Sequence, residues 1–238
     1  MHYHGLFSVA LLMLATASLR ADDAKIEALL SQLHRAGTDL KSLAASVTLA
    51  NVDPDLGDET TRRGSLVLQR LPDGDTRLRV SLVDKITGNR TTQEQRDVIL
   101  EGNKLIDRDH RAKKQTTRQV RKPGEKIDLF KLGQGPFPLP VGQSPEEVHA
   151  QFDVTPGDAS DVVVLSPKPN TALAKKFKRI IVTVNAENGL PSRIETLDPN
   201  EASRTIATLS NVRVNQDVSD AEFTLPAIDE KVWNLVDE

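Results

Sequence analysis

The sequence predicts a mainly β (α+β) fold, in which one curved antiparallel sheet of roughly nine to eleven strands carries two or three helices against its concave apolar face. Three observations lead to this prediction. Apolar and polar residues alternate along many short segments, which is the spacing of strands. Gly, Pro and Asn separate these segments, and few stretches show helical spacing. A sheet with this many strands tends to curl or close, so we expect a half-open β-barrel.

Residues 62–83 predict a β-hairpin around which this sheet is organised. Two alternating segments flank a tight Pro-Asp-Gly-Asp turn at residues 72–75. The two-residue periodicity of a strand places five apolar residues on one face: Leu66, Leu68, Leu78, Val80 and Leu82. The same periodicity places Arg70 on that face, where the desolvation of a cation is unfavourable unless the cation is paired.

Two segments predict helices. Asp22 and Asp23 can cap an amphipathic helix that carries apolar residues at positions 26, 29, 30 and 33 and ends near Gly37. The run Ser144-Pro145-Glu146-Glu147 has the pattern of a capping box with proline at the first helical position, so a short helix should reach about Gln151.

The amino terminus has the features of an export signal. Residues 6–19 form a short apolar run, which is followed by small residues before two aspartates. We expect residues 1–21 to be a signal peptide that is cleaved near Ala17 or Ala21, and residues 22–238 to form a single domain. The mature protein should therefore lie outside the cytoplasm.

Composition and motifs argue against several classes of protein. The 238 residues contain no cysteine, which excludes disulfides and thiolate chemistry, and the net charge of −3 gives no reason to expect nucleic acid. The sequence holds no nucleophile elbow, zinc-protease or nucleotide-binding motif. His34, His110 and His149 lie in unrelated local settings. We expect no enzymatic activity, no cofactor and no metal site.

Residues 108–126 are densely basic and contain no aromatic residue that could stack on a nucleic-acid base. Two interpretations remain. The segment is either a solvated edge of the sheet, protected from edge-to-edge pairing by its charges, or a docking patch for an acidic partner or anionic head groups. The candidate docking residues are Arg111, Lys113, Lys114, Arg118 and Arg121.

Residues 127–142 thread apolar side chains among glycines and prolines, so they cannot form a regular central strand or helix. Phe137 and Leu139 belong to this segment. It is too apolar for an idle loop, and we expect it to pack over another part of the molecule.

The order of these features resembles the periplasmic outer-membrane lipoprotein carrier family, the LolA-like proteins. The most telling segments are Gly64-Ser65-Leu66-Val67-Leu68-Gln69-Arg70 and Glu101-Gly102-Asn103-Lys104-Leu105. They are followed by the Pro-rich apolar segment before a helix and by a Phe-Thr-Leu-Pro tail. The resemblance covers about residues 24–226. It implies a carrier of acyl chains that accepts cargo from an inner-membrane lipoprotein-releasing ABC transporter and passes it to an outer-membrane receptor.

The resemblance also implies roles for particular residues. The cavity for lipoproteins or other lipids would be lined by Leu66, Leu68, Leu78, Val80, Leu82, Phe137 and Leu139. Arg70 would be the latch that holds lid segments over the empty cavity; alternatively, it is a strand-end cation that reaches solvent. The protein should be a periplasmic monomer. The alternative function is a lipid-binding sensor or envelope-stress regulatory module with the same fold.

Overall fold

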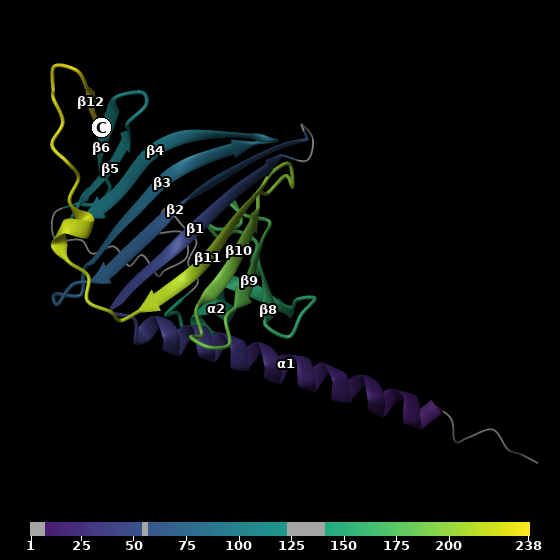
Figure 1. Ribbon diagram of the computed structural model, residues 1–238. Coiled ribbons are helices and arrows are strands. Elements are labelled where there is room, and N and C mark those ends of the chain that lie inside the picture. The colour runs from purple at the N-terminus through teal and green to yellow at the C-terminus, as the bar shows by residue number, and fades with distance from the viewer. Residues whose placement is uncertain (1–7, 54–56, 123–140) are drawn as a thin grey trace, which may run out of the picture.

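The computed structural model describes residues 8–53, 57–122 and 141–238 and folds them into one large sheet with two α-helices and a short 3-10 helix. The long helix lies along one end of a strongly curved sheet (Figure 1). The elements in chain order are α1 (Ser8–Thr38), β1 (Ser42–Asp53), β2 (Asp58–Arg70), β3 (Thr76–Thr87), β4 (Arg90–Glu101), β5 (Lys104–Asp109), β6 (Lys114–Gln119), α2 (Pro145–Gln151), β7 (Phe152–Pro156), β8 (Val162–Pro167), β9 (Arg179–Val184), β10 (Pro191–Leu197), β11 (Arg204–Val214), η1 (Asp220–Phe223) and β12 (Asn234–Asp237).

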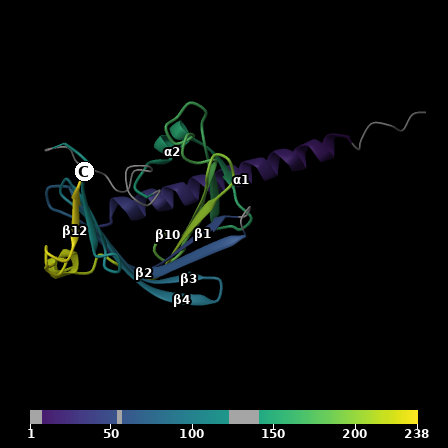
Figure 2. The same cartoon turned by 90° about the horizontal axis from the view of Figure 1, so that it is seen from above.

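The sheet is mixed at one edge and antiparallel everywhere else. Its strand order is β12-β6-β5-β4-β3-β2-β1-β11-β10-β9-β8-β7, and β12 runs parallel to β6. The sheet bends around the side on which α1 and α2 lie and stays open between its two edges (Figure 2). The predicted mainly β, half-open architecture is therefore confirmed. The described strands number twelve, because residues 234–237, near the end of the chain, extend the sheet by pairing with the backbone of β6.

β2 and β3 form the hairpin that the sequence predicts. Leu66 pairs with Val80, and Leu68 pairs with Leu78, so their side chains share one face. Gly74 has a φ of 83°, a left-handed conformation that glycine adopts without steric cost. This hairpin supplies the centre of the concave face.

The N-terminal helix is longer than predicted. We expected it to begin at Asp22 or Asp23, but α1 runs without interruption from Ser8 to Thr38. Residues 8–21 contain neither Gly nor Pro, so nothing in this stretch of sequence breaks the helix. None of the described helices combines the length and apolar content needed to cross a membrane.

The second helix begins as the sequence predicts. The Ser144 hydroxyl accepts a hydrogen bond from the backbone N–H of Glu147 (3.2 Å), and a Glu147 carboxylate oxygen accepts one from the backbone N–H of Ser144 (3.0 Å). Pro145 occupies the first turn, where its missing N–H has no intrahelical partner to lose. The reciprocal bonds fix the start of α2, which places the buried Val148 against the core.

Candidate functional site

The concave side of the β2–β3 hairpin carries a continuous apolar face. It consists of Leu66, Leu68, Leu78, Val80 and Leu82, whose exposed fractions lie between 0% and 7%. These are five of the seven predicted cavity residues, and the structure brings them together on neighbouring strands. The other two, Phe137 and Leu139, lie outside the described residues. We call the five described residues the apolar face.

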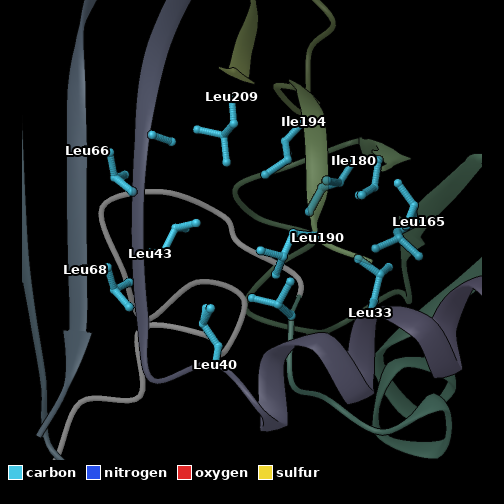
Figure 3. Close-up of a cluster of buried hydrophobic side chains, with 14 of the residues drawn as sticks. Leu33, Leu40, Leu43, Leu66, Leu68, Leu165, Ile180, Leu190, Ile194 and Leu209 are labelled. Atoms are coloured by element: carbon cyan, nitrogen blue, oxygen red, sulfur yellow. The ribbon is translucent and has the colours of Figure 1, made fainter. Parts of the chain in front are cut away.

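One side of α1 is apolar and contributes to the same buried cluster as the apolar face. Ile26, Leu30 and Leu33 are between 2% and 5% exposed and belong to the same buried cluster as the apolar face. Figure 3 shows Leu33 and Leu40 pointing toward leucines and isoleucines from both arms of the curved sheet. Because α1 and the apolar face contribute to one buried cluster, moving α1 away from that cluster would expose apolar surface.

Arg70 stands where β2 ends, beside the last turn of α1. Its guanidinium donates through Nη1 to the carbonyl of Thr38 (3.2 Å) and through Nη2 to the carbonyl of Gly37 (3.3 Å). Carbonyls at the end of a helix lack intrahelical donors and carry the negative end of the helix dipole, so a cation is favourable there. Arg70 is half-buried. The cation that strand periodicity placed among leucines thus bonds to the end of α1, a helix whose apolar residues belong to the same buried cluster as those leucines.

The end of α1 also contacts the segment that leads into α2. The His34 ring nitrogen Nδ1 lies 2.9 Å from the carbonyl oxygen of Gly142, and the Gly142 N–H donates to the Leu33 carbonyl (3.3 Å). A Cβ on Gly37 would lie 2.2 Å from the Gly142 nitrogen, so the two backbones pack directly against each other. We call this contact region the helix junction; it comprises Leu33, His34, Gly37, Thr38, Arg70 and Gly142.

A family model described as outer membrane lipoprotein carrier protein LolA matches residues 84–226, which is more than half of the chain. The chain belongs to the LolA family. The predicted family is therefore confirmed, and its shared fold agrees with the curved, open sheet described above. No curated protein sequence matches this chain.

Solved structures with a similar fold are distant in sequence. The Pseudomonas aeruginosa MucA/MucB complex contains a chain with 12% identity, and the match covers 84% of this chain and 61% of that chain with a TM-score of 0.48. An uncharacterized conserved protein from Thermus thermophilus has 11% identity over 88% of this chain and 97% of its own, with a TM-score of 0.47. LprF from Mycobacterium bovis has 14% identity over 87% and 99%, with a TM-score of 0.42. This chain spans about three fifths of the chain that it matches in the MucA/MucB complex.

The basic residues predicted for docking do not share one environment in this LolA-family protein. Arg111, Lys113 and Lys114 are exposed. Arg118 is exposed and pairs with Glu238 at 2.6 Å. Arg121 is different, because its side chain is only 7% exposed and both of its terminal nitrogens donate to the carboxylate of Asp75 beside the β2–β3 turn. The hydrogen bonds and charge of Asp75, with a smaller contribution from the charge of Asp73, raise the pKa of Arg121, so it stays charged in an internal ion pair.

The convex face of the sheet carries a polar network that sequence reasoning missed. Residues 215–233, which we call the C-terminal strap, cross the outer side of β3 on the way to β12 (Figure 1). Arg77 pairs with Asp220 at 2.5 Å and lies 4.0 Å from the ring centre of Phe223. Arg79 donates to the carbonyl of Glu222 (3.1 Å), and Arg108 donates to the carbonyl of Pro226 (2.7 Å). These arginines fasten the strap to the sheet.

Asp97 on β4 is the centre of this network. Its carboxylate accepts hydrogen bonds from the Ser81 hydroxyl (2.5 Å) and from Arg79 (3.0 Å), and His110 Nε2 lies 2.8 Å away. Burial opposes ionisation, but the bonds from Ser81, His110 and Arg79 together outweigh it and hold the pKa of Asp97 below its usual range. The His110 ring also packs edge-on against Trp233, with ring centres 5.5 Å apart.

The sequence contained a weak signal for the strap. Phe223 and Trp233 are large apolar residues in a polar C-terminal region, and three polar side chains alternate on the outer side of β3. The order of this network differs from that of a Ser-His-Asp triad, because the carboxylate of Asp97 lies between the Ser81 hydroxyl and the His110 ring. Among the residues that the structure describes, no group of three or more His, Asp or Glu side chains could hold a metal ion.

Proposed function

We propose that this protein is a periplasmic carrier that shelters the acyl chains of lipoproteins against its apolar face and moves them from the inner to the outer membrane. The observation that supports this most strongly is a buried apolar face that shares its cluster with α1, whose end bonds to Arg70. The family membership supports the same function. In this proposal residues 1–21 direct export and are then removed.

The free energy that drives an acyl chain out of water is large. Burying each CH₂ group contributes ~0.8 kcal/mol, so one 16-carbon chain gains about 12 kcal/mol on leaving water. A lipid-modified protein therefore cannot cross an aqueous compartment at useful concentration without an apolar shelter. The carrier must supply a concave apolar surface and a cover that moves aside, and it needs no reactive group.

The helix junction provides a mechanism for covering and uncovering this surface. In the empty protein, the bonds from Arg70 to the end of α1 favour the covered arrangement. An incoming acyl chain competes with α1 for the apolar face and exchanges one set of apolar contacts for another, so binding is favourable without being irreversible. In the same proposal an inner-membrane ABC transporter delivers the lipoprotein and an outer-membrane receptor removes it.

A solubilisation assay tests this function. Purified protein is incubated with liposomes that hold a fluorescent triacylated lipopeptide, the liposomes are sedimented, and the lipopeptide in the supernatant is measured. We expect a soluble complex of the protein and the lipopeptide. A supernatant no richer in lipopeptide than a protein-free control would overturn the carrier function.

Two neighbouring variants locate the binding surface. Leu82→Gln places an amide on the apolar face, where the side chain is 7% exposed, whereas Val83→Gln makes the same type of change at a side chain that is 49% exposed. We expect Leu82→Gln to lower the solubilised lipopeptide several-fold and Val83→Gln to leave it unchanged. Circular dichroism of both variants checks that the sheet is folded.

A further inference from the structure

A second concavity lies on the β3–β4 hairpin, toward the end that is remote from Arg70. It has a volume of about 340 Å³. Its lining combines three cationic side chains with two hydroxyls: Lys85, Thr87, Arg90, Thr92 and Arg111. Lys85 pairs with Thr92, and Thr87 pairs with Arg90, so these four side chains share one face of the hairpin. We call this concavity the basic depression.

The basic depression belongs to the same side of the sheet as the apolar face. Lys85 pairs with Arg62 on β2, and Arg62 lies four residues before Leu66 on a strand whose pairing with β1 is unbroken. Residues an even number apart on a strand point to the same side. The nearest residues of the two regions, Leu82 and Lys85, are three positions apart on β3, which spans at most about 10 Å at ~3.3 Å per residue.

The cations of the basic depression differ from Arg62 and Arg96, two other cations on the concave side, in their ion pairing. Arg62 pairs with Glu94 at 2.9 Å, and Arg96 pairs with Asp107 at 2.6 Å. Over residues 8–53, 57–122 and 141–238, none of the three cations of the basic depression forms an ion pair. Three like charges that face one open volume repel each other, and an anion placed between them relieves that repulsion.

The donors favour a phosphate group over other anions. A phosphate offers several oxygens, and Lys, Arg and Thr side chains are the donors that proteins most often direct at it. Two hydroxyls beside three cations can contact several of these oxygens at once. A volume of about 340 Å³ also accommodates a phosphate with a small polar substituent. We propose that the basic depression is a binding site for the phosphate of an anionic phosphate ester.

The phosphate ester can be a lipid head group or a small soluble molecule. A single amphiphile could place its acyl chain on the apolar face and its phosphate in the basic depression, because both lie on the concave side and their nearest residues, Leu82 and Lys85, are at most about 10 Å apart along β3. This link between the two regions rests on the proposed carrier function. Phosphate binding in the depression does not depend on it.

Isothermal titration calorimetry on the purified protein tests the proposal with three probes. The probes are glycerol 3-phosphate, a short-chain phosphatidylglycerol below its micelle concentration, and the zwitterionic phosphatidylcholine of the same chain length. The double variant Lys85→Gln/Arg90→Gln removes two of the lining charges. The matched control Lys175→Gln/Lys176→Gln removes two charges from exposed lysines outside the depression.

We expect the wild type and the control to bind phosphatidylglycerol at least tenfold more tightly than phosphatidylcholine, and the depression variant to lose this preference. Binding of glycerol 3-phosphate that the variant also loses identifies a soluble ester as a ligand, whereas binding of phosphatidylglycerol alone identifies a lipid head group. Equal binding of the two lipids by the wild type, together with no loss of glycerol 3-phosphate binding in the variant, overturns the proposal.

The same variants separate this proposal from the carrier function. The fluorescent probe N-phenyl-1-naphthylamine is uncharged and reports the apolar face. We expect the depression variant to bind it with wild-type affinity. Loss of the phosphate preference with unchanged probe binding leaves the carrier function standing, and absence of probe binding in the wild type contradicts the carrier function without bearing on the phosphate site.

Discussion

Replacing Arg70 with leucine tests the proposed latch directly. The substitution removes two hydrogen bonds to the end of α1 and leaves an apolar side chain at the border of the apolar face. A hydrogen bond from a charged group contributes about 1.5–3 kcal/mol. The two donor–acceptor distances of 3.2 and 3.3 Å are long for such bonds, and Arg70 is half-exposed. We therefore expect the covered arrangement to lose about 1–3 kcal/mol in total relative to the uncovered one.

This loss has a measurable effect on ligand binding. A ligand that binds only when α1 has moved aside gains apparent affinity when the covered arrangement is weakened. Since about 1.4 kcal/mol corresponds to a factor of ten, N-phenyl-1-naphthylamine should bind Arg70→Leu about tenfold more tightly than wild type. Hydrogen exchange at the backbone amides of residues 35–42 should accelerate in the same variant, because these amides lie at the helix junction. Delivery of lipopeptide to acceptor liposomes should become slower.

Arg63→Leu is the matched control for this experiment. Arg63 lies on the same strand and is exposed on the opposite face, seven residues from Arg70. We expect its probe affinity and its amide exchange to equal those of wild type. If Arg70→Leu also behaves like wild type in both measurements, the latch is refuted and Arg70 is only a cation at the end of a strand.

Three further predictions concern the strap and the helix junction. Asp97→Asn should lower the free energy of unfolding by about 1–3 kcal/mol in urea titrations, because Arg79 loses its charged acceptor; Asp153→Asn at an exposed position should leave it unchanged. Because the pKa of Asp97 is lower in the folded than in the unfolded protein, its stabilisation is complete above about pH 4 and is lost as the pH falls through the folded-state value. The stability difference between wild type and Asp97→Asn should therefore shrink toward pH 2, and a difference that stayed constant would contradict the role of ionisation. Gly37→Ala should lower the melting temperature although alanine favours helices by ~1 kcal/mol, because the new Cβ would lie 2.2 Å from the Gly142 nitrogen; a higher melting temperature would contradict this close packing.

The strands and the apolar face could be predicted because their signals are local. Alternation along residues 62–83 reported which side chains share a face, and the register of Leu66 with Val80 and Leu68 with Leu78 agrees with that reading. The capping box at Ser144 was equally local and is present as expected. Each of these features depends on residues a few positions apart, so the sequence is sufficient to recognise it.

The extent of the sheet and of α1 was harder to predict. Residues 84–96 are rich in charged and polar side chains, yet most of them belong to β3 and β4, which bulge near Gln95 at a φ of 49°. Among the strands that the structure describes, β12 pairs only with β6, and its four residues carry no strand pattern of their own. Such segments become strands because a neighbouring strand offers backbone partners, and not because of their own alternation.

The sequence by itself determined that one side of this sheet is apolar, that Arg70 lies on that side, and that the chain resembles a family of lipoprotein carriers. Only the tertiary structure decided what Arg70 bonds to, because its acceptors on α1 lie 32 and 33 residues away. The same holds for the C-terminal strap, where Arg79 and Glu222 are 143 residues apart, and for the basic depression, where Arg111 joins a hairpin to which it does not belong. Periodicity along a strand fixes the side to which a residue points, whereas its partner depends on how the whole sheet curves.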